Sequence, residues 1–239
     1  MKETIYTIPV MEALENPGPC AFCTMHAQLS AATLHSLAGP SVAYMEGDVR
    51  EATNKAGFCP AHLKALYASK NRLGLALMLH THLMEVNSKL TKFYSGGKKS
   101  FFAKGPSGLP EYLAALDATC YLCTIIDTSF ERYLDTFFAL FSKEDKVKKF
   151  VTDGSGVCLP HLAALSAAAP KSLSAADLRH FTAALHAAQT RAMDKIQADL
   201  DWFIKKFDYR NQNEPWHDAK DAVERAMALL AGGENAQSQ

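Results

Sequence analysis

The sequence predicts an all-α protein, a helical bundle built from two similar modules, each of them a helical hairpin. Apolar residues recur every three or four positions along almost every long segment, whereas the alternation typical of strands is nearly absent. The 239 residues are 48% hydrophobic, which is enough to build a sizeable core. A code of cysteine and histidine residues occurs twice and predicts the division into modules.

The clearest helix lies in the middle of the chain. Ile126, Phe130, Leu134, Phe137 and Phe141 follow one another in steps of three or four, and charged residues occupy the opposite face. We therefore expect this stripe to be buried.

Two further apolar series predict long helices. The series from Leu75 to Leu90 indicates a helix that begins near Pro60 and bends about Gly74. The series from Leu178 to Phe207 indicates another, which Ser174 starts as the first half of a capping box with Asp177.

The end of the chain predicts a last amphipathic helix over 218–230, which stops at Gly232 and Gly233 because glycine commonly ends helices. The aromatic residues between Trp202 and Trp216 are expected to pack this C-terminal helix onto the bundle.

One segment has the composition of a linker. Residues 94–110 are rich in Gly, Ser, Pro and Lys. They predict a first module over 1–104, with a long helix, and a second over 105–239, with the C-terminal helices, or else a single domain in which the two modules pack together.

Both halves contain a CxxC pair followed, after 35 or 34 intervening residues, by a CxxH pair. The first set is Cys20, Cys23, Cys59 and His62, and the second is Cys120, Cys123, Cys158 and His161. The segments GFCPAHLKAL (57–66) and GVCLPHLAAL (156–165) also share six residues at an offset of 99. The code uses every cysteine of the chain, and we interpret it as an internal duplication.

A CxxC pair supplies two corners of a tetrahedral metal site, and a second pair completes it. We expect each half to form its own Cys3His site, so that the ion closes the open end of one helical hairpin. Pro60 and Pro160 indicate that Cys59 and Cys158 precede helices, which places His62 and His161 one turn later on the same face. The positive ends of these helices would stabilise the excess negative charge of three thiolates.

Four protein ligands around an ion favour a structural role, so two structural zinc ions are the first prediction. An iron–sulfur cluster is the alternative for the same ligands, which would make the protein an electron carrier. A thiol-based redox sensor or enzyme with Cys20 or Cys120 as nucleophile is a third possibility. Buried free cysteines would explain neither the duplication nor the two histidines.

Other features limit the functional class. The chain contains no Gly-rich phosphate loop, GxSxG or HExxH motif, which argues against an enzyme. Its 25 basic and 25 acidic residues argue against nucleic acid and anionic membrane as partners. The longest apolar run, residues 73–79, is far shorter than the roughly 20 residues that span a bilayer. With no signal-peptide pattern, we expect a cytoplasmic interaction or regulatory module with a protein partner that the sequence does not identify.

Several segments together resemble an uncharacterised family of bacterial helical proteins with two CxxC and CxxH modules, grouped as a domain of unknown function. They are the Cys20–Cys23 pair, NKAGFCPAH, NRLGLALMLHTHL, CYLC, SFERYLDTFF, GVCLPH and DLDWFIKKFDYRN. The resemblance extends from about residue 16 to residue 230, and CAFC departs from it in lacking a proline after the first cysteine. It implies a cytosolic helical protein and no particular activity.

Overall fold

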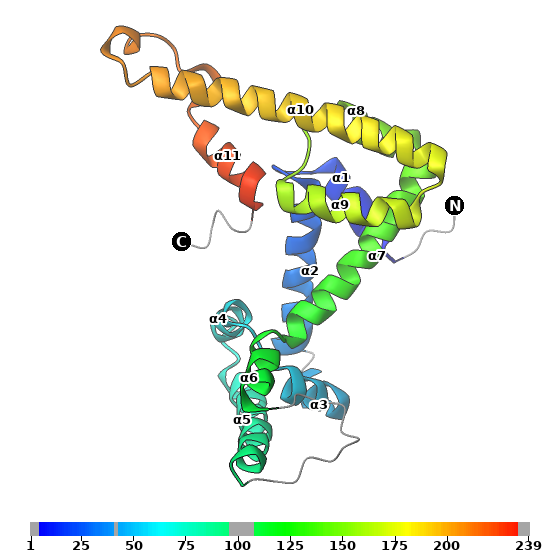
Figure 1. Cartoon of the computed structure of the whole chain (residues 1–239), viewed down its shortest axis with the longest axis vertical. Helices are drawn as coiled ribbons and strands as arrows, with labels where there is room; N and C mark the ends of the chain where they lie inside the picture. Colours follow the sequence, from blue (N-terminus) through cyan, green and yellow to red (C-terminus); the bar gives the residue numbers. More distant parts are fainter. Residues whose placement is uncertain (1–4, 41–42, 96–107, 234–239) are drawn as a thin grey trace. The chain divides into compact units, whose positions relative to one another are not determined.

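The computed structural model describes residues 5–40, 43–95 and 108–233, and within these ranges every regular element is helical (Figure 1). The prediction of an all-α fold is therefore confirmed. The α-helices are α1 (Thr7–Glu15), α2 (Ala21–Ala38), α3 (Gly47–Ala56), α4 (Pro60–Ala68), α5 (Arg72–Tyr94), α6 (Leu109–Asp117), α7 (Tyr121–Lys143), α8 (Asp145–Asp153), α9 (Leu159–Ser172), α10 (Ala175–Lys205) and α11 (Ala222–Ala231). Three short 3-10 helices are η1 (Ala43–Met45), η2 (Tyr209–Asn211) and η3 (His217–Ala219).

The chain forms two compact units. Unit 1 comprises residues 1–27 together with 130–239, and unit 2 comprises residues 28–129. Helix α2 begins in unit 1 and continues into unit 2, whereas α7 begins in unit 2 and continues into unit 1. This arrangement differs from the predicted modules over 1–104 and 105–239. Of the segment interpreted as a linker, 94–110, residues 96–107 lie outside the described residues.

Unit 1 has an aromatic core. Phe137 is fully buried, and its ring lies 5.0 Å from that of Phe22 and 6.2 Å from that of Phe181. Phe181 in turn packs against Phe138 and Phe141 at 5.3 and 5.2 Å. The whole apolar stripe predicted for residues 126–141 is buried in α7, as expected.

Helix α10 is one continuous helix of 31 residues. Its N-cap is Ser174, whose side-chain oxygen accepts a hydrogen bond from the backbone N–H of Asp177 at 3.1 Å, so the predicted start of the helix is confirmed. The Asp177 carboxylate accepts from the Ser174 hydroxyl at 2.9 Å. The expected apolar face does not stay buried to its end, because Phe207 is 74% exposed. Trp202 and Trp216 do hold the following loop, through Trp202 Nε1–H to Pro215 O and ring contact between Trp216 and Phe203.

One helix predicted in unit 2 is divided in the structure. The helix expected from Pro60 to Leu90 is two helices, because α4 ends at Ala68 and Lys70 adopts a left-handed backbone with φ of +65°. Asn71 then starts α5: its side-chain oxygen accepts a hydrogen bond from Gly74 N–H, and its Nδ2 donates to Ala38 O at 2.9 Å. The Asn71 side chain thus bonds the last residue of α2, Ala38, and starts α5.

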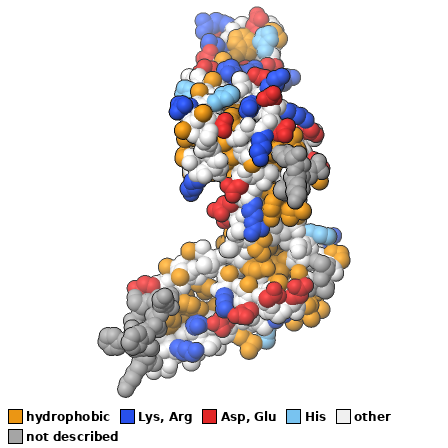
Figure 2. Space-filling view, turned by 90° about the vertical axis from the view of Figure 1, so that its right-hand side faces the viewer, with side chains coloured by type: hydrophobic (Ala, Val, Ile, Leu, Met, Phe, Trp, Pro, Cys, Tyr) orange, Lys and Arg blue, Asp and Glu red, His pale blue; other side chains and the backbone are white. Residues whose placement is uncertain are grey.

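The surface matches the balanced composition. On the face drawn in Figure 2, acidic and basic side chains are interspersed rather than gathered into fields of one sign. In the described part of the chain, no single helix has both the length and the apolar composition of a membrane crossing; α6 and α7 pass that test only as a pair, bent by 55°.

Candidate metal centres

The structure gathers the eight predicted ligands into two tetrads, each of which could hold a metal ion. The unit-1 centre consists of Cys20, Cys23, Cys158 and His161, and the unit-2 centre consists of Cys59, His62, Cys120 and Cys123. The candidate ligand atoms of each tetrad all lie within 4.8 Å of one another. Both tetrads are Cys3His sets.

The pairing expected within each half of the sequence is wrong. The first CxxC pair meets the second CxxH pair, and the second CxxC pair meets the first CxxH pair. The reason is that each CxxC pair lies at the start of a long helix, α2 or α7, that continues into the other unit. The next CxxH pair along the chain therefore falls in the other unit, and each tetrad is completed by a segment distant in sequence.

Each centre lies at the N-termini of two helices. Cys20 and Cys120 directly precede α2 and α7, and their carbonyl oxygens accept the first helical hydrogen bonds, from Thr24 N and Thr124 N at 3.1 Å. Cys59 and Cys158 are the N-cap residues of α4 and α9, as predicted from the neighbouring prolines. Two positive helix ends therefore face each group of thiolates, which favours the charged form.

A glycine with positive φ precedes each CxxH pair. Gly57 has φ of +61° and Gly156 has φ of +76°, and each lies two residues before its cysteine. A side chain at either position would also collide with the next long helix. The Cβ built at Gly57 lies 2.8 Å from the ring of His82, and the one at Gly156 lies 2.9 Å from Gln189 Oε1.

His82 and Gln189 are functional neighbours that the sequence reasoning did not find. His82 Nδ1 donates to Asn54 O at 2.8 Å just before the first CxxH turn, and Gln189 Oε1 accepts from Val157 N–H at 3.0 Å just before the second. Both side chains therefore fix the backbone that presents Cys59 and Cys158. No local pattern marks them, because these two residues lie on α5 and α10, more than 20 positions after the cysteines.

The distances in the unit-1 centre fit a single tetrahedral ion. Zn–S bonds of about 2.3 Å and Zn–N bonds of about 2.0 to 2.1 Å place the sulfurs about 3.8 Å apart and each sulfur about 3.6 Å from the nitrogen. Here Cys23 Sγ lies 3.6 Å from Cys158 Sγ. His161 Nδ1 lies 3.8, 3.4 and 3.0 Å from the sulfurs of Cys20, Cys23 and Cys158.

The unit-2 centre has matching dimensions. Cys59 Sγ and Cys123 Sγ are 3.8 Å apart. His62 Nδ1 lies 3.2 Å from Cys59 Sγ and 3.3 Å from the sulfurs of both Cys120 and Cys123. In both centres Nδ1 is thus the nitrogen turned toward the sulfurs, and all six cysteines are free rather than joined in disulfides.

Without an ion, the unit-1 centre retains protons. Hydrogen bonds with the sulfurs of Cys158 and Cys23 hold the pKa of Cys20 well below its usual value, whereas the same network raises the pKa of Cys158. Burial lowers the pKa of His161, but hydrogen bonds with the Cys20 and Cys23 sulfurs outweigh burial and raise it to about 9. At neutral pH, Cys158 is therefore a thiol and His161 an imidazolium.

The unit-2 centre distributes its protons in a similar way. Burial, followed by the neighbouring sulfurs of Cys120 and Cys59, raises the pKa of Cys123 to about 12. Burial also raises the pKa of Cys59, but the backbone N–H of His62 and the other sulfurs outweigh it, and the net pKa lies below the usual value. Without an ion, each tetrad therefore combines one cysteine whose pKa is lowered with one whose pKa is raised.

Metal binding at the unit-1 centre is expected to strengthen steeply with pH. An ion must displace the protons of Cys158 and His161, so between pH 6 and 8 the affinity should rise about tenfold per pH unit for each group displaced. Calorimetric zinc titrations in buffers of different ionisation enthalpy would count the released protons. The variant Cys59→Ser/His62→Ala isolates this centre, and a pH-independent affinity would contradict the expectation.

Among the other histidines, His26 lies near the unit-1 centre. Its ring packs against Phe130 at 5.6 Å and against His161 at 6.5 Å, and it belongs to neither tetrad. His80 and His82 also stand outside the tetrads.

Comparison with known protein families agrees with the resemblance seen in the sequence. A family model described as a family of unknown function, DUF6062, matches residues 1–237. The chain belongs to DUF6062. Searches with this DUF6062 member found no match among curated proteins and none among solved structures. Membership of DUF6062 therefore confirms the resemblance to a family of unknown function. The chemistry of the two tetrads is the basis for inferring a function.

Proposed function

We propose that the protein binds two zinc ions, one at the unit-1 centre and one at the unit-2 centre, and that both ions are structural. The observation that carries this proposal is the spacing of the donor atoms. Sulfur–sulfur distances of 3.6 and 3.8 Å match the edges of a tetrahedron around one zinc ion. The presence of two such tetrads, with identical donor sets, makes an accidental cluster of thiols a poor explanation.

The donor set supports zinc over an iron–sulfur cluster. Three thiolates and one imidazole suit a borderline-soft ion with tetrahedral geometry. In a cluster, the cysteines ligate different iron atoms and are held apart by the inorganic core. The close contact between Cys23 Sγ and Cys158 Sγ leaves room for one ion instead. With four protein donors around it, that ion has no position open for substrate, which supports a structural role.

The contribution of each ion would be to join distant parts of the chain. The unit-1 centre connects Cys23 with Cys158, 135 residues later, and the unit-2 centre connects Cys59 with Cys123, 64 residues later. Linking segments so far apart stabilises the folded state, because metal affinity and folding are thermodynamically coupled. A framework fixed in this way suits a cytoplasmic interaction or regulatory module that acts on a protein partner.

The proposal is tested by metal analysis of the protein purified anaerobically without added metal. Inductively coupled plasma mass spectrometry should find two zinc ions per chain, and the solution should be colourless. Native mass spectrometry should show the mass of two ions on the intact chain and their loss under denaturing conditions. Less than one metal ion per chain would contradict metal binding. Iron with visible charge-transfer absorption would replace zinc with an iron–sulfur cluster.

A further inference from the structure

The end of α11 lies directly on the unit-1 centre. The backbone N–H of Gly233 donates a hydrogen bond to Cys23 Sγ at 3.4 Å. Gly232 ends the helix with φ of +85°, and a Cβ built on it would lie 3.6 Å from Cys23 Sγ and 3.7 Å from Cys158 Sγ. The end of α11 therefore contacts Cys23 Sγ directly, and the space between Gly232 and the sulfurs of Cys23 and Cys158 is no wider than one methyl group.

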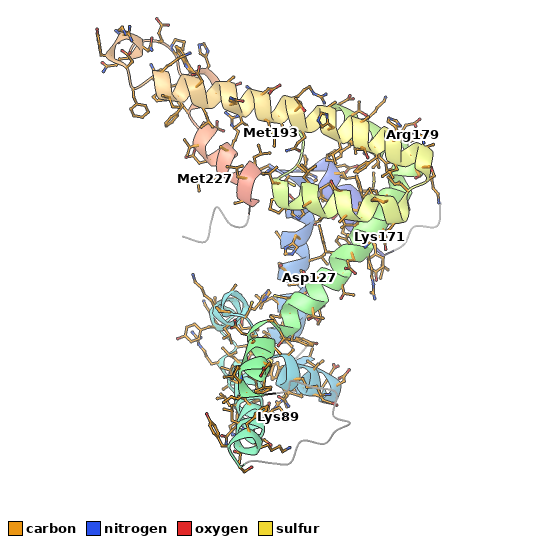
Figure 3. The ribbon with its side chains drawn as sticks, viewed as in Figure 1. Lys89, Asp127, Lys171, Arg179, Met193 and Met227 are labelled. Atoms are coloured by element: carbon orange, nitrogen blue, oxygen red, sulfur yellow. The ribbon has the colours of Figure 1, made fainter. Side chains whose placement is uncertain are left out.

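Helix α11 is held in this position by its own contacts. It packs against both α9 and α10 (Figure 1). Arg225 Nη1 bonds Asp199 Oδ2 on α10 at 2.9 Å, and the side chain of Asp199 is only 16% exposed. In Figure 3, Met227 marks α11 and Met193 the facing helix α10. The glycine pair is thus the end of an anchored helix rather than a loose tail.

The rest of the unit-1 centre is partly shielded. Cys20 and Cys158 are only 3% and 1% exposed, while Cys23 and His161 are half-buried. The ring of His161 lies between those of Phe22 and Phe130, at 6.0 and 5.3 Å. A cavity of about 380 Å3 borders Cys20, but the burial of that residue keeps its sulfur away from solvent.

The unit-2 centre is more accessible. Of its members only Cys120 is buried, whereas Cys59, His62 and Cys123 are half-buried. Cys59 also borders a cavity of about 290 Å3, whose wall includes His82 and the exposed Asp117. A small chelating molecule can approach this centre from the cavity side.

We propose that the two centres differ in metal exchange: the unit-2 centre exchanges its ion with small chelators and other soft or borderline divalent ions, whereas the end of α11 retains the ion of the unit-1 centre. This inference rests on the proposed binding of two ions. Exchange needs an incoming ligand near the metal or a proton on a departing sulfur. The Gly233 N–H bond lowers the charge density on Cys23 Sγ, and the covering chain excludes the incoming ligand. The protein can thus release or replace the ion of the unit-2 centre while the unit-1 centre keeps its own.

The experiment follows zinc release from the fully loaded chain to an excess of a chromogenic chelator. We expect two phases of one ion each, with rate constants that differ about tenfold or more. Cys59→Ser/His62→Ala should remove the fast phase and leave the slow one. Release of both ions in a single phase, or assignment of the slow phase to the unit-2 centre, would overturn the inference.

A matched pair of variants tests whether the Gly233 N–H bond retains the ion, without removing a metal ligand. Gly233→Pro deletes the N–H donor, and the ψ of 156° at Gly232 is compatible with a following proline. Gly233→Ala keeps the donor, and its Cβ would only touch Cys23 Cβ at 3.9 Å. We expect the proline variant to accelerate the slow phase about tenfold and the alanine variant to leave it unchanged.

The outcomes separate this inference from the proposed function. If the rate constant of the slow phase is the same in the wild type and in Gly233→Pro, the inferred role of the end of α11 is overturned. Two bound ions would still support the proposed function. A chain that binds no zinc contradicts the proposed function and this inference with it. Replacement of one ion by Cd2+, followed by its ultraviolet thiolate absorption, gives a second readout of the exchangeable centre.

Discussion

Replacing Cys158 with serine is expected to expose Cys20 and Cys23 to alkylation while Cys120 and Cys123 stay protected. Cys158 shares its tetrad with the first CxxC pair, so its loss should release the ion of the unit-1 centre alone. A structural zinc ion contributes on the order of 10 kcal/mol to folding, so the variant should also lose most of the stability of unit 1. Native mass spectrometry and mapping of labelled cysteines measure both effects.

The control is the corresponding change in the other centre. Cys59→Ser should expose Cys120 and Cys123 and leave Cys20 and Cys23 protected. The two variants are chemically identical, so general effects of serine cancel in the comparison. If Cys158→Ser exposed the second CxxC pair instead, the crossed pairing of the structure would be wrong, and each half would form its own site.

Replacing Phe137 with alanine is expected to lower the free energy of unfolding of unit 1 by about 3 to 5 kcal/mol. The side chain is fully buried and packs between the rings of Phe22 and Phe181, so its removal leaves a cavity as well as lost contacts. Denaturant titration followed by circular dichroism measures the change.

Phe207→Ala provides the matched control, because the same atoms are removed from a side chain that is 74% exposed. Its effect should stay within about 0.5 kcal/mol. Equal losses in both variants would contradict the assignment of Phe137 to the core. A large loss in Phe137→Ala would also support the packing of the N-terminal segment, through Phe22, with residues beyond 130.

Helices and their ends could be predicted wherever the signal is local. The stripe of α7 follows from a repeat of three and four residues, and the start of α10 follows from Ser174 and Asp177. The positions of Cys59 and Cys158 as N-caps follow from the adjacent prolines. In each case residues within one or two turns decide the conformation, because backbone hydrogen bonds of a helix span only four residues.

The break between α4 and α5 shows where local reasoning fails. The apolar series continues across it, and the sequence therefore favoured one helix. In the folded chain the side chain of Asn71 bonds Ala38 O, 33 residues earlier, as well as its own helix. A contact with a distant segment made the break favourable, and periodicity carries no information about such contacts.

The eight side chains of the candidate centres and the chemistry they offer can be read from residue types and spacing, because cysteine and histidine at spacing three share one helix face. Which CxxC pair meets which CxxH pair follows only from the folded chain. Either pairing gives two Cys3His sets, so ligand chemistry cannot distinguish them. The choice depends on α2 and α7, which begin in one unit and continue into the other, and the packing of distant segments sets their course.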